Sequence, residues 1–271
     1  MSTIDEPDPI PFDMRRNINL LVVEHCNNTC VHCSTGSPFA KRAFHPADSF
    51  FEWLDTLERE HVPFDYISLT GGEPFMHPGV LDGSYIRQLR DRYPSKRVGA
   101  TTNFFWASEK GIERCAPGIA LMNGGLNISL YANIVARLGG QQRAHDLVGL
   151  LRKRCPDTNI NATELPTFIA WEFHEDQREV KGPCVTSDCF VLRPDGRLSH
   201  CSLAIGGENR PDYAAIIGRS KEAFFDLSRG VEGYSAWASK YPFDLCSHCT
   251  MWRHDVQPIS FDVGRERKVP R

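Results

Sequence analysis

The sequence lacks the features of several large classes of protein. Its 31 Lys and Arg residues against 34 Asp and Glu residues give a net charge of -3, and the longest run of basic residues is the triplet Arg152-Lys153-Arg154. Because binding to a nucleic-acid backbone needs clustered Lys and Arg, nucleic acid is not expected as the main partner. Residues 1–11 lack the order of a signal peptide, and no apolar run approaches the length of a membrane span. We therefore expect a cytoplasmic protein with no membrane partner.

The chain also lacks low-complexity segments and internal repeats. Its 271 residues are enough for one large domain, or for one domain with an appendage. Hydrophobic residues make up 41% and charged residues 24%, a balance typical of globular proteins that bury a sizeable core.

Cysteine is scarce in the middle of the chain and concentrated towards its ends. The ten cysteines are Cys26, Cys30, Cys33, Cys115, Cys155, Cys184, Cys189, Cys201, Cys246 and Cys249. Because the sequence shows no export signal, this usage favours metal ligation over disulfides. Cys115 and Cys155 each lie near the end of a helix-like segment, and we interpret both as small buried hydrophobic residues.

Three cysteines form a C-x3-C-x2-C pattern directly after the apolar run 18–23: Cys26, Cys30 and Cys33. Iron-sulfur clusters are held by cysteine thiolates, usually four. Three thiolates from one short loop leave one iron without a protein ligand, and an open iron can bind a small molecule. The pattern therefore indicates a catalytic cluster. A zinc knuckle is the alternative, since Cys and His at short spacings also hold zinc.

The cysteine pattern, with His32 before the third cysteine, resembles the signature of the radical S-adenosylmethionine (radical SAM) family. A second match to that family is the SAM-binding motif Gly71, Gly72, Glu73 and Pro74, at the end of another apolar run. Zinc does not explain this second motif. The resemblance covers roughly residues 17–175.

The resemblance implies a first [4Fe-4S] cluster on Cys26, Cys30 and Cys33, whose open iron takes the amino and carboxylate groups of SAM. One electron then cleaves SAM into methionine and a 5′-deoxyadenosyl radical, which abstracts a hydrogen atom from the substrate. The cofactor carries out the difficult step, and the protein positions it.

Strand-like and helix-like segments alternate through the first 175 residues. We expect strands at 17–24, 64–70, 97–102, 126–131 and 160–164, with a sixth in 167–173, and helices from about 46, at 79–93, at 108–115 and within 139–155. Such alternation is typical of parallel β/α units, whose active site lies at the carboxyl ends of the strands. Five or six units are too few for a closed barrel. We predict an α/β fold with a partial TIM-like (β/α)5–6 barrel, as the family uses.

Loops at the carboxyl ends of these strands are the candidates for SAM binding. Gly71 and Gly72 allow backbone to approach the methionine end closely. Glu73 can accept from the ammonium group or orient the loop, which Pro74 stiffens; an ordinary strand-to-helix turn is the alternative.

Three further residues become candidates through the family resemblance. Asn103 and Ser129, at the ends of the third and fourth strands, would contact the ribose or the methionyl carboxylate. Turn and capping roles are equally open for both. His32 would cover the cluster or the adenine.

The C-terminal part carries a second candidate metal centre. Pro194-Asp195-Gly196 predicts a β-hairpin between 190–192 and 198–199, and residues 212–240 look helical. Cysteines around a hairpin plus a later C-x2-C make a four-thiolate site, which suits a cluster or structural zinc equally well by geometry.

The spacing of these cysteines resembles the twitch and SPASM extensions of radical SAM enzymes. It implies one auxiliary [4Fe-4S] cluster on Cys184, Cys201, Cys246 and Cys249, with Cys189 as the rival of Cys184. A fully ligated cluster would serve electron transfer or structure. The pattern is similar to that of the deoxy-scyllo-inosamine dehydrogenase of butirosin biosynthesis.

These interpretations divide the chain into an extended lead-in (1–16), a radical SAM barrel (17–175), an auxiliary-cluster domain of hairpin plus helix (176–256) and a tail (257–271). The first functional hypothesis is oxidation or epimerisation of a small polar sugar- or cyclitol-like metabolite, with flavodoxin or ferredoxin as reductant. The second is modification of a ribosomally made peptide, and the third is a non-catalytic iron-sulfur or zinc protein.

Overall fold

The structure is a computed structural model of the chain. It describes residues 17–28, 30, 33–165, 167–168, 177, 179–180, 189–210, 214–219, 221–238, 243–249 and 259–260. Among these residues, no helix is both long enough and apolar enough to cross a bilayer.

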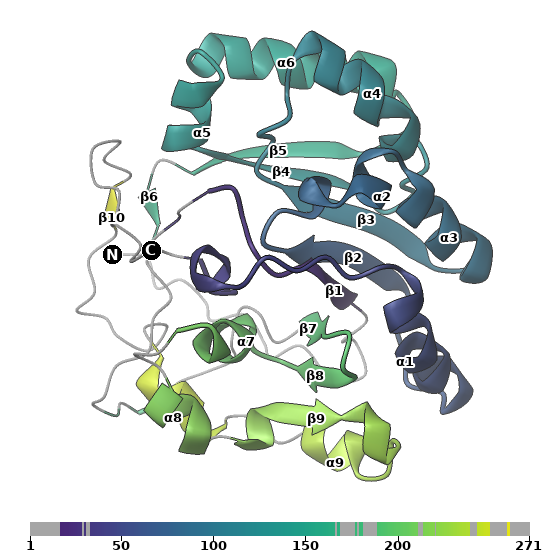
Figure 1. The fold of residues 1–271 in the computed structure, drawn as a ribbon, viewed down its shortest axis with the longest axis vertical. Coiled ribbons are helices and arrows are strands. Elements are labelled where there is room, and N and C mark those ends of the chain that lie inside the picture. Colours follow the sequence, from purple (N-terminus) through teal and green to yellow (C-terminus); the bar gives the residue numbers. More distant parts are fainter. Residues whose placement is uncertain are drawn as a thin grey trace, which may run out of the picture.

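Eight strands form one sheet in the order β5-β4-β3-β2-β1-β7-β8-β9 (Figure 1). The strands are β1 (Asn17–Val23), β2 (Tyr66–Gly71), β3 (Arg97–Thr102), β4 (Gly125–Tyr131), β5 (Ile160–Leu165), β7 (Cys189–Leu192), β8 (Arg197–Ser199) and β9 (Phe224–Asp226). Strands β1 to β5 pair in parallel, and β7 pairs in parallel with β1. The sheet is mostly parallel and ends at two separate edge strands, so the predicted unclosed α/β barrel is confirmed.

Helices connect the parallel strands, as the alternating pattern predicts. The α-helices are α1 (Asp48–Arg59), α2 (Pro78–Leu81), α3 (Ser84–Arg92), α4 (Glu109–Ile119), α5 (Ala132–Arg137), α6 (Gln141–Arg154), α7 (Ser202–Glu208), α8 (Ala214–Arg219) and α9 (Tyr234–Ala238). Short 3-10 turns are η2 (Ser37–Phe39), η3 (Pro74–Met76), η5 (Lys221–Ala223), η6 (Leu227–Arg229) and η7 (Asp244–His248). In Figure 1, α4 and α6 lie over β4 and β5, while α1 and α3 flank β1 to β3.

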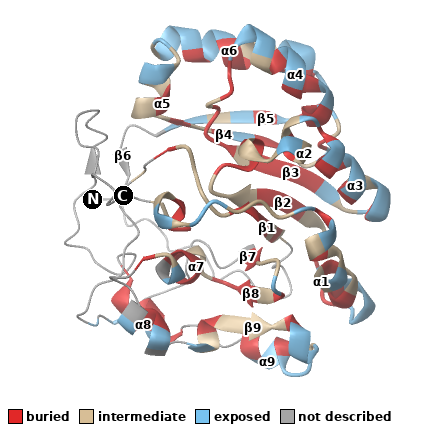
Figure 2. Ribbon diagram, viewed as in Figure 1, coloured by how far each residue is buried: buried red, intermediate tan, exposed pale blue. Residues whose placement is uncertain are grey.

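The two faces of the sheet have different chemistry because successive strand residues point to opposite sides. On the convex side, Leu20, Leu69 and Ile128 join one large buried core with apolar residues of α1, α3, α4 and α6. Figure 2 shows the helices red towards the sheet and pale blue outside. A separate small cluster of Leu21, Val191 and Ile205 lies on the concave side.

Two helices differ from expectation because of glycine and proline. The single helix expected over 79–93 is split into α2 and α3 at Gly83, which adopts a φ of +81°. A Cβ on Gly83 would lie 2.4 Å from the Cα of Gly118 in α4, so glycine permits this close crossing. Helix α4 runs to Ile119 and includes Pro117, beyond the predicted end at 115.

The C-terminal hairpin is confirmed, and it extends the barrel sheet. Strands β7 and β8 pair antiparallel around a turn in which Gly196 has a φ of +82°. The expectation that 212–240 is helical is wrong in part, because residues 224–226 form β9 beside β8. Of the expected sixth strand, β6 (Thr167–Phe168) pairs with β10 (Ile259–Ser260) in a second sheet. The domain boundaries stay a prediction.

Candidate active site

The three N-terminal cysteines lie together at the carboxyl end of β1. All three are half-buried. Burial raises the pKa of Cys26 to about 12, with smaller contributions from Glu73 and Cys33. Burial likewise raises the pKa of Cys30 to about 12, followed by the effects of Cys33 and Cys26. Each thiol therefore lies within electrostatic reach of the others, as ligands of one cluster must.

Amide and hydroxyl groups surround these sulfurs. The backbone N–H of Asn28 donates to Cys26 Sγ (3.4 Å), and its side-chain Nδ2 donates to Cys30 Sγ (2.9 Å). Thr35 Oγ1 lies 3.3 Å from Cys33 Sγ. Sequence reasoning missed Asn28 and Thr35, although both lie within two residues of a cysteine. Hydrogen bonds to sulfur are among the factors that tune an iron-sulfur cluster.

The donor set fits an iron-sulfur cluster. A zinc ion with Zn–S bonds of about 2.3 Å would hold its tetrahedral sulfurs about 3.8 Å apart. In the part of the chain that the structure describes, no three His, Cys, Asp or Glu side chains gather to hold a metal ion. An iron-sulfur cluster bonds each thiolate to a different iron and does not need the sulfurs to converge on one point.

The glycines of the second motif bring the ends of β1 and β2 into contact. Gly72 N–H donates to Val23 O (2.7 Å), and Glu73 N–H donates to His25 O (3.3 Å). A Cβ on Gly72 would lie 1.8 Å from His25 O, and Gly71 adopts a φ of +126°. Glycine at both positions is therefore required by the cysteine loop itself.

Glu73 ties the ends of β2 and β3 together. Only 1% exposed, its carboxylate accepts from Phe75 N (3.1 Å), Thr102 Oγ1 (2.8 Å) and Asn103 N (2.7 Å). Burial raises its pKa to about 7, against the lowering effect of these three donors. Of the two predicted roles, these contacts support orientation of the loop. Pro74 opens the 3-10 turn η3 directly after it.

Asn103 contacts the cysteine loop. Its Nδ2 donates to Asn27 Oδ1 (2.9 Å) and approaches Cys26 Sγ (3.6 Å), while its Oδ1 accepts from Phe105 N (3.0 Å). The Asn103 side chain therefore both bonds the turn that follows β3 and contacts the cysteine loop.

Ser129 lies on β4 and hydrogen-bonds to Tyr131. Burial, together with the charges of Cys30, Cys33 and Cys26, raises the pKa of Tyr131 to about 12, against the lowering effect of the Ser129 hydrogen bond. Tyr131 is a site residue that sequence reasoning missed, although it ends a predicted strand. His32 lies outside the described residues.

The C-terminal cysteines come from two segments that pack together. Cys201 follows β8 and is half-buried, while Cys246 and Cys249 are buried in and after η7. The rings of His200 and Phe243 lie 5.4 Å apart, which places the first segment against the second. Cys184 lies outside the described residues, and Cys189 begins β7, so the choice between them stays a prediction.

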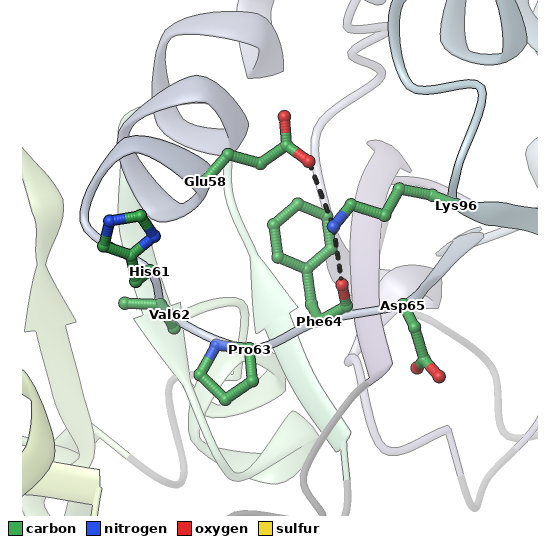
Figure 3. A pocket seen from close by; sticks show the side chains of 7 residues that line it. All are labelled: Glu58, His61, Val62, Pro63, Phe64, Asp65 and Lys96. Carbon is green, nitrogen blue, oxygen red and sulfur yellow. Dashed lines mark hydrogen bonds and ion pairs between the residues drawn. The ribbon is translucent and has the colours of Figure 1, made fainter.

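Two surface hollows lie away from the cysteines. The larger, of about 360 Å³, is at the amino ends of β2 and β3, where Lys96 Nζ bonds Phe64 O (2.9 Å) and pairs with Glu58 (3.0 Å) (Figure 3). The other, of about 310 Å³, lies between α6 and β5. Because the cysteine loop is at the opposite ends of the strands, the hollow in Figure 3 is not part of the candidate site.

Comparison with known proteins agrees with this geometry. A profile of the radical SAM superfamily matches residues 20–176. A search among curated proteins finds no significant match. Among solved structures, BtrN in complex with AdoMet and 2-DOIA is similar at a TM-score of 0.52 and 15% identity, covering 86% of this chain and 92% of BtrN.

Two further structures are more distantly similar. BtrN in an open conformation has a TM-score of 0.44 at 15% identity, over 86% of this chain and 91% of that one. SuiB from Streptococcus suis, bound to precursor peptide SuiA, has a TM-score of 0.37 at 10% identity, over 78% and 64%.

Proposed function

Because this chain belongs to the radical SAM superfamily, we propose that it is an enzyme that reductively cleaves SAM and abstracts hydrogen from a small polar metabolite. The observation that carries the proposal is the gathering of Cys26, Cys30 and Cys33 beside the buried Glu73 loop. When bound there, a [4Fe-4S] cluster supplies the electron that converts SAM into methionine and a 5′-deoxyadenosyl radical.

The protein groups around this site bind and orient. Cys26, Cys30 and Cys33 hold the cluster, and the amides of Asn28 and Asn103 donate towards the sulfurs. Such donors stabilise charge on thiolates and keep the loop in one conformation.

Glu73 fixes the loop that faces SAM without contributing a free carboxylate, since three donors already occupy its oxygens. The neighbouring backbone of Gly71 and Gly72 is then held where the methionyl ammonium can bind to carbonyl groups. Pro74, Ser129 and His32 complete the proposed SAM site.

For the substrate we propose oxidation of a carbinol carbon in a sugar- or cyclitol-like ring, with epimerisation as the close variant. The similarity to BtrN, a structure that contains 2-DOIA, supports this substrate class. Oxidation needs an acceptor for a second electron. An auxiliary [4Fe-4S] cluster on Cys184, Cys201, Cys246 and Cys249 would fill that role, and flavodoxin or ferredoxin would supply the first electron.

The test is anaerobic reconstitution of the full chain with iron and sulfide, followed by SAM and dithionite. We expect 5′-deoxyadenosine, and we expect deuterium from a cyclitol labelled at its carbinol carbons to appear in it. Absence of 5′-deoxyadenosine from a protein carrying its full iron content would overturn the proposal. 5′-Deoxyadenosine that takes up deuterium only from a peptide would instead favour peptide modification.

A further inference from the structure

A row of uncharged polar side chains crosses the concave face of the sheet. Thr101 on β3 pairs with Asn127 on β4, which pairs with Asn161 on β5. The register of β2 and β3 places Thr70 beside Thr101. We name Thr70, Thr101, Asn127 and Asn161 the polar row.

The alternation of the strands settles which face the polar row occupies. Its neighbours along the strands, Leu69, Ala100 and Ile160, all belong to the core beneath the helices. The polar row therefore points to the opposite side. On β1 the next position is Leu21, which belongs to the concave cluster with Val191.

These side chains retain their hydrogen-bonding capacity. Asn127 and Asn161 are exposed, and Thr70 and Thr101 are half-buried. None of the four side chains bonds to another described residue. Thr102, one position from the polar row, has its hydroxyl fully engaged with Glu73, Phe104 and Trp106. The side chains of the polar row can therefore bond to a ligand in the barrel interior, whereas the hydroxyl of Thr102 is already used within the protein.

On the face of β1 to β5 that carries the polar row, no strand residue beside the row is a cation. The cation of the neighbouring helix α5, Arg137, lies within electrostatic reach of Cys30 and Glu73, at the level of the cysteines. The charged residue on this face is Arg97 at the amino end, and it pairs with Asp65 (3.9 Å). Tyr66 lies over Gly99 between that end and the polar row, and donates to Gly124 O (3.3 Å). A buried phosphate or carboxylate needs charged partners, so this surface suits a ligand without an anionic group.

The polar row is separated along the strands from the level of the three cysteines. Tyr131, whose ring is near the three cysteines, follows Asn127 by four residues on the same face. At about 3.3 Å per residue this separates them by about 13 Å. Ser129 and Thr163, which pair across β4 and β5, lie between the two levels. A six-membered ring held on the polar row would therefore lie between that row and the level of the cysteines.

We propose that the polar row binds the hydroxyl groups of a polyhydroxylated ring without an anionic group, and presents a carbinol carbon to SAM. The inference rests on the proposed function and names its substrate-binding surface. Adjacent strands are about 4.8 Å apart, so neighbouring side chains reach different hydroxyls of one ring. Carboxamides and hydroxyls both donate and accept, which matches the dual character of an alcohol.

The test is isothermal titration calorimetry on the reconstituted full chain with SAM, using scyllo-inositol, 2-deoxy-scyllo-inosamine and myo-inositol 1-phosphate as probes. We expect at least one of the first two to bind and the phosphate ester not to bind. Asn127→Leu and Thr101→Val should each weaken binding by roughly 3- to 10-fold, the value of one hydrogen bond. Gln88→Leu, on the exposed face of α3, is the matched control and should bind as the unaltered chain does.

Binding of neither non-anionic probe, tighter binding of the phosphate ester, or unchanged affinity in both folded variants would overturn the inference. Two variants on separate strands guard against a folding defect, which thermal denaturation detects. Formation of 5′-deoxyadenosine by the unaltered chain without a cyclitol tests the proposed function separately, because the calorimetry does not require SAM cleavage.

Discussion

The two cysteine-rich regions are built in different ways. Cys26, Cys30 and Cys33 come from one loop, anchored by β1 on one side and by the Gly72–His25 contact on the other. Cys201 and Cys246 come from segments more than forty residues apart, joined by packing such as the His200–Phe243 contact. The first site is a property of local spacing, whereas the second depends on the tertiary structure around it.

The largest effect is expected in the N-terminal loop. Cys30→Ala should abolish SAM cleavage and lower the iron content from about eight to about four per chain, the value for one remaining [4Fe-4S] cluster. Cys115→Ala is the matched control, because Cys115 is buried among core residues of α4 far from the loop in sequence. Iron analysis and 5′-deoxyadenosine formation are the measurements. Equal iron loss in both variants would remove the distinction between cluster and core cysteines.

A change in the C-terminal cysteine region should have a smaller effect on activity than a change in the N-terminal loop. Cys246→Ala is expected to remove about four irons, the content of one [4Fe-4S] cluster, and to suppress formation of oxidised product. The change that SAM causes in the electron paramagnetic resonance spectrum of the first cluster should persist. If Cys246→Ala abolished that spectral change, the two centres would not be separate.

The contact between the cysteine loop and the Gly71–Pro74 motif can be tested by a substitution that adds one methyl group. In Gly72→Ala the new Cβ would meet His25 O at 1.8 Å, so the two loops must separate. We expect SAM affinity to fall by at least about tenfold, equivalent to about 1.4 kcal/mol. In the control Gly149→Ala, in α6, a Cβ meets nothing within 4 Å. The free energy of unfolding should there rise by about 0.5–1 kcal/mol, from helix propensity.

A smaller effect concerns the pH dependence of stability. Burial raises the pKa of Glu73 from 4.5 to about 7. Between these values the folded protein keeps a proton that the unfolded chain has lost, so this group's contribution to stability is present below pH 4.5 and declines as the pH rises to 7. The decline is at most about 3 kcal/mol. Glu73→Gln removes the titration, and urea unfolding of the metal-free protein at pH 5 and pH 8 measures it.

At pH 5 Glu73→Gln should be the less stable protein by about 1–3 kcal/mol, because its amide nitrogen faces a backbone or hydroxyl donor. The difference should shrink at pH 8. A difference that stayed constant between the two pH values would mean that Glu73 titrates in the same way in the folded and unfolded states.

The sequence predicts most of the barrel because hydrophobic periodicity and glycine positions are local signals. The bounds of β3 agree fully, and the hairpin around Gly196 follows from its turn residues. Strand β9 was missed because Phe224 and Phe225 suit a helix face as well as a strand, and only pairing with β8 decides. The contact of Asn103 with the cysteine loop depends on two strand ends meeting, which no spacing reveals.

The split of the expected 79–93 helix also depends on a tertiary contact. Gly83 is visible in the sequence, but its left-handed conformation is set by the close approach to Gly118 of α4. The role of Glu73 likewise depends on tertiary structure, since its donors Thr102 and Asn103 are the last residue of β3 and the residue after it.

The most direct measurement is electron-nuclear double resonance on the reduced, reconstituted chain with SAM labelled by 15N at its amino group and 17O at its carboxylate. We expect hyperfine coupling of both labels to the cluster on Cys26, Cys30 and Cys33, because one iron lacks a protein ligand. A fully reconstituted cluster that binds SAM with no coupling to either label would contradict it.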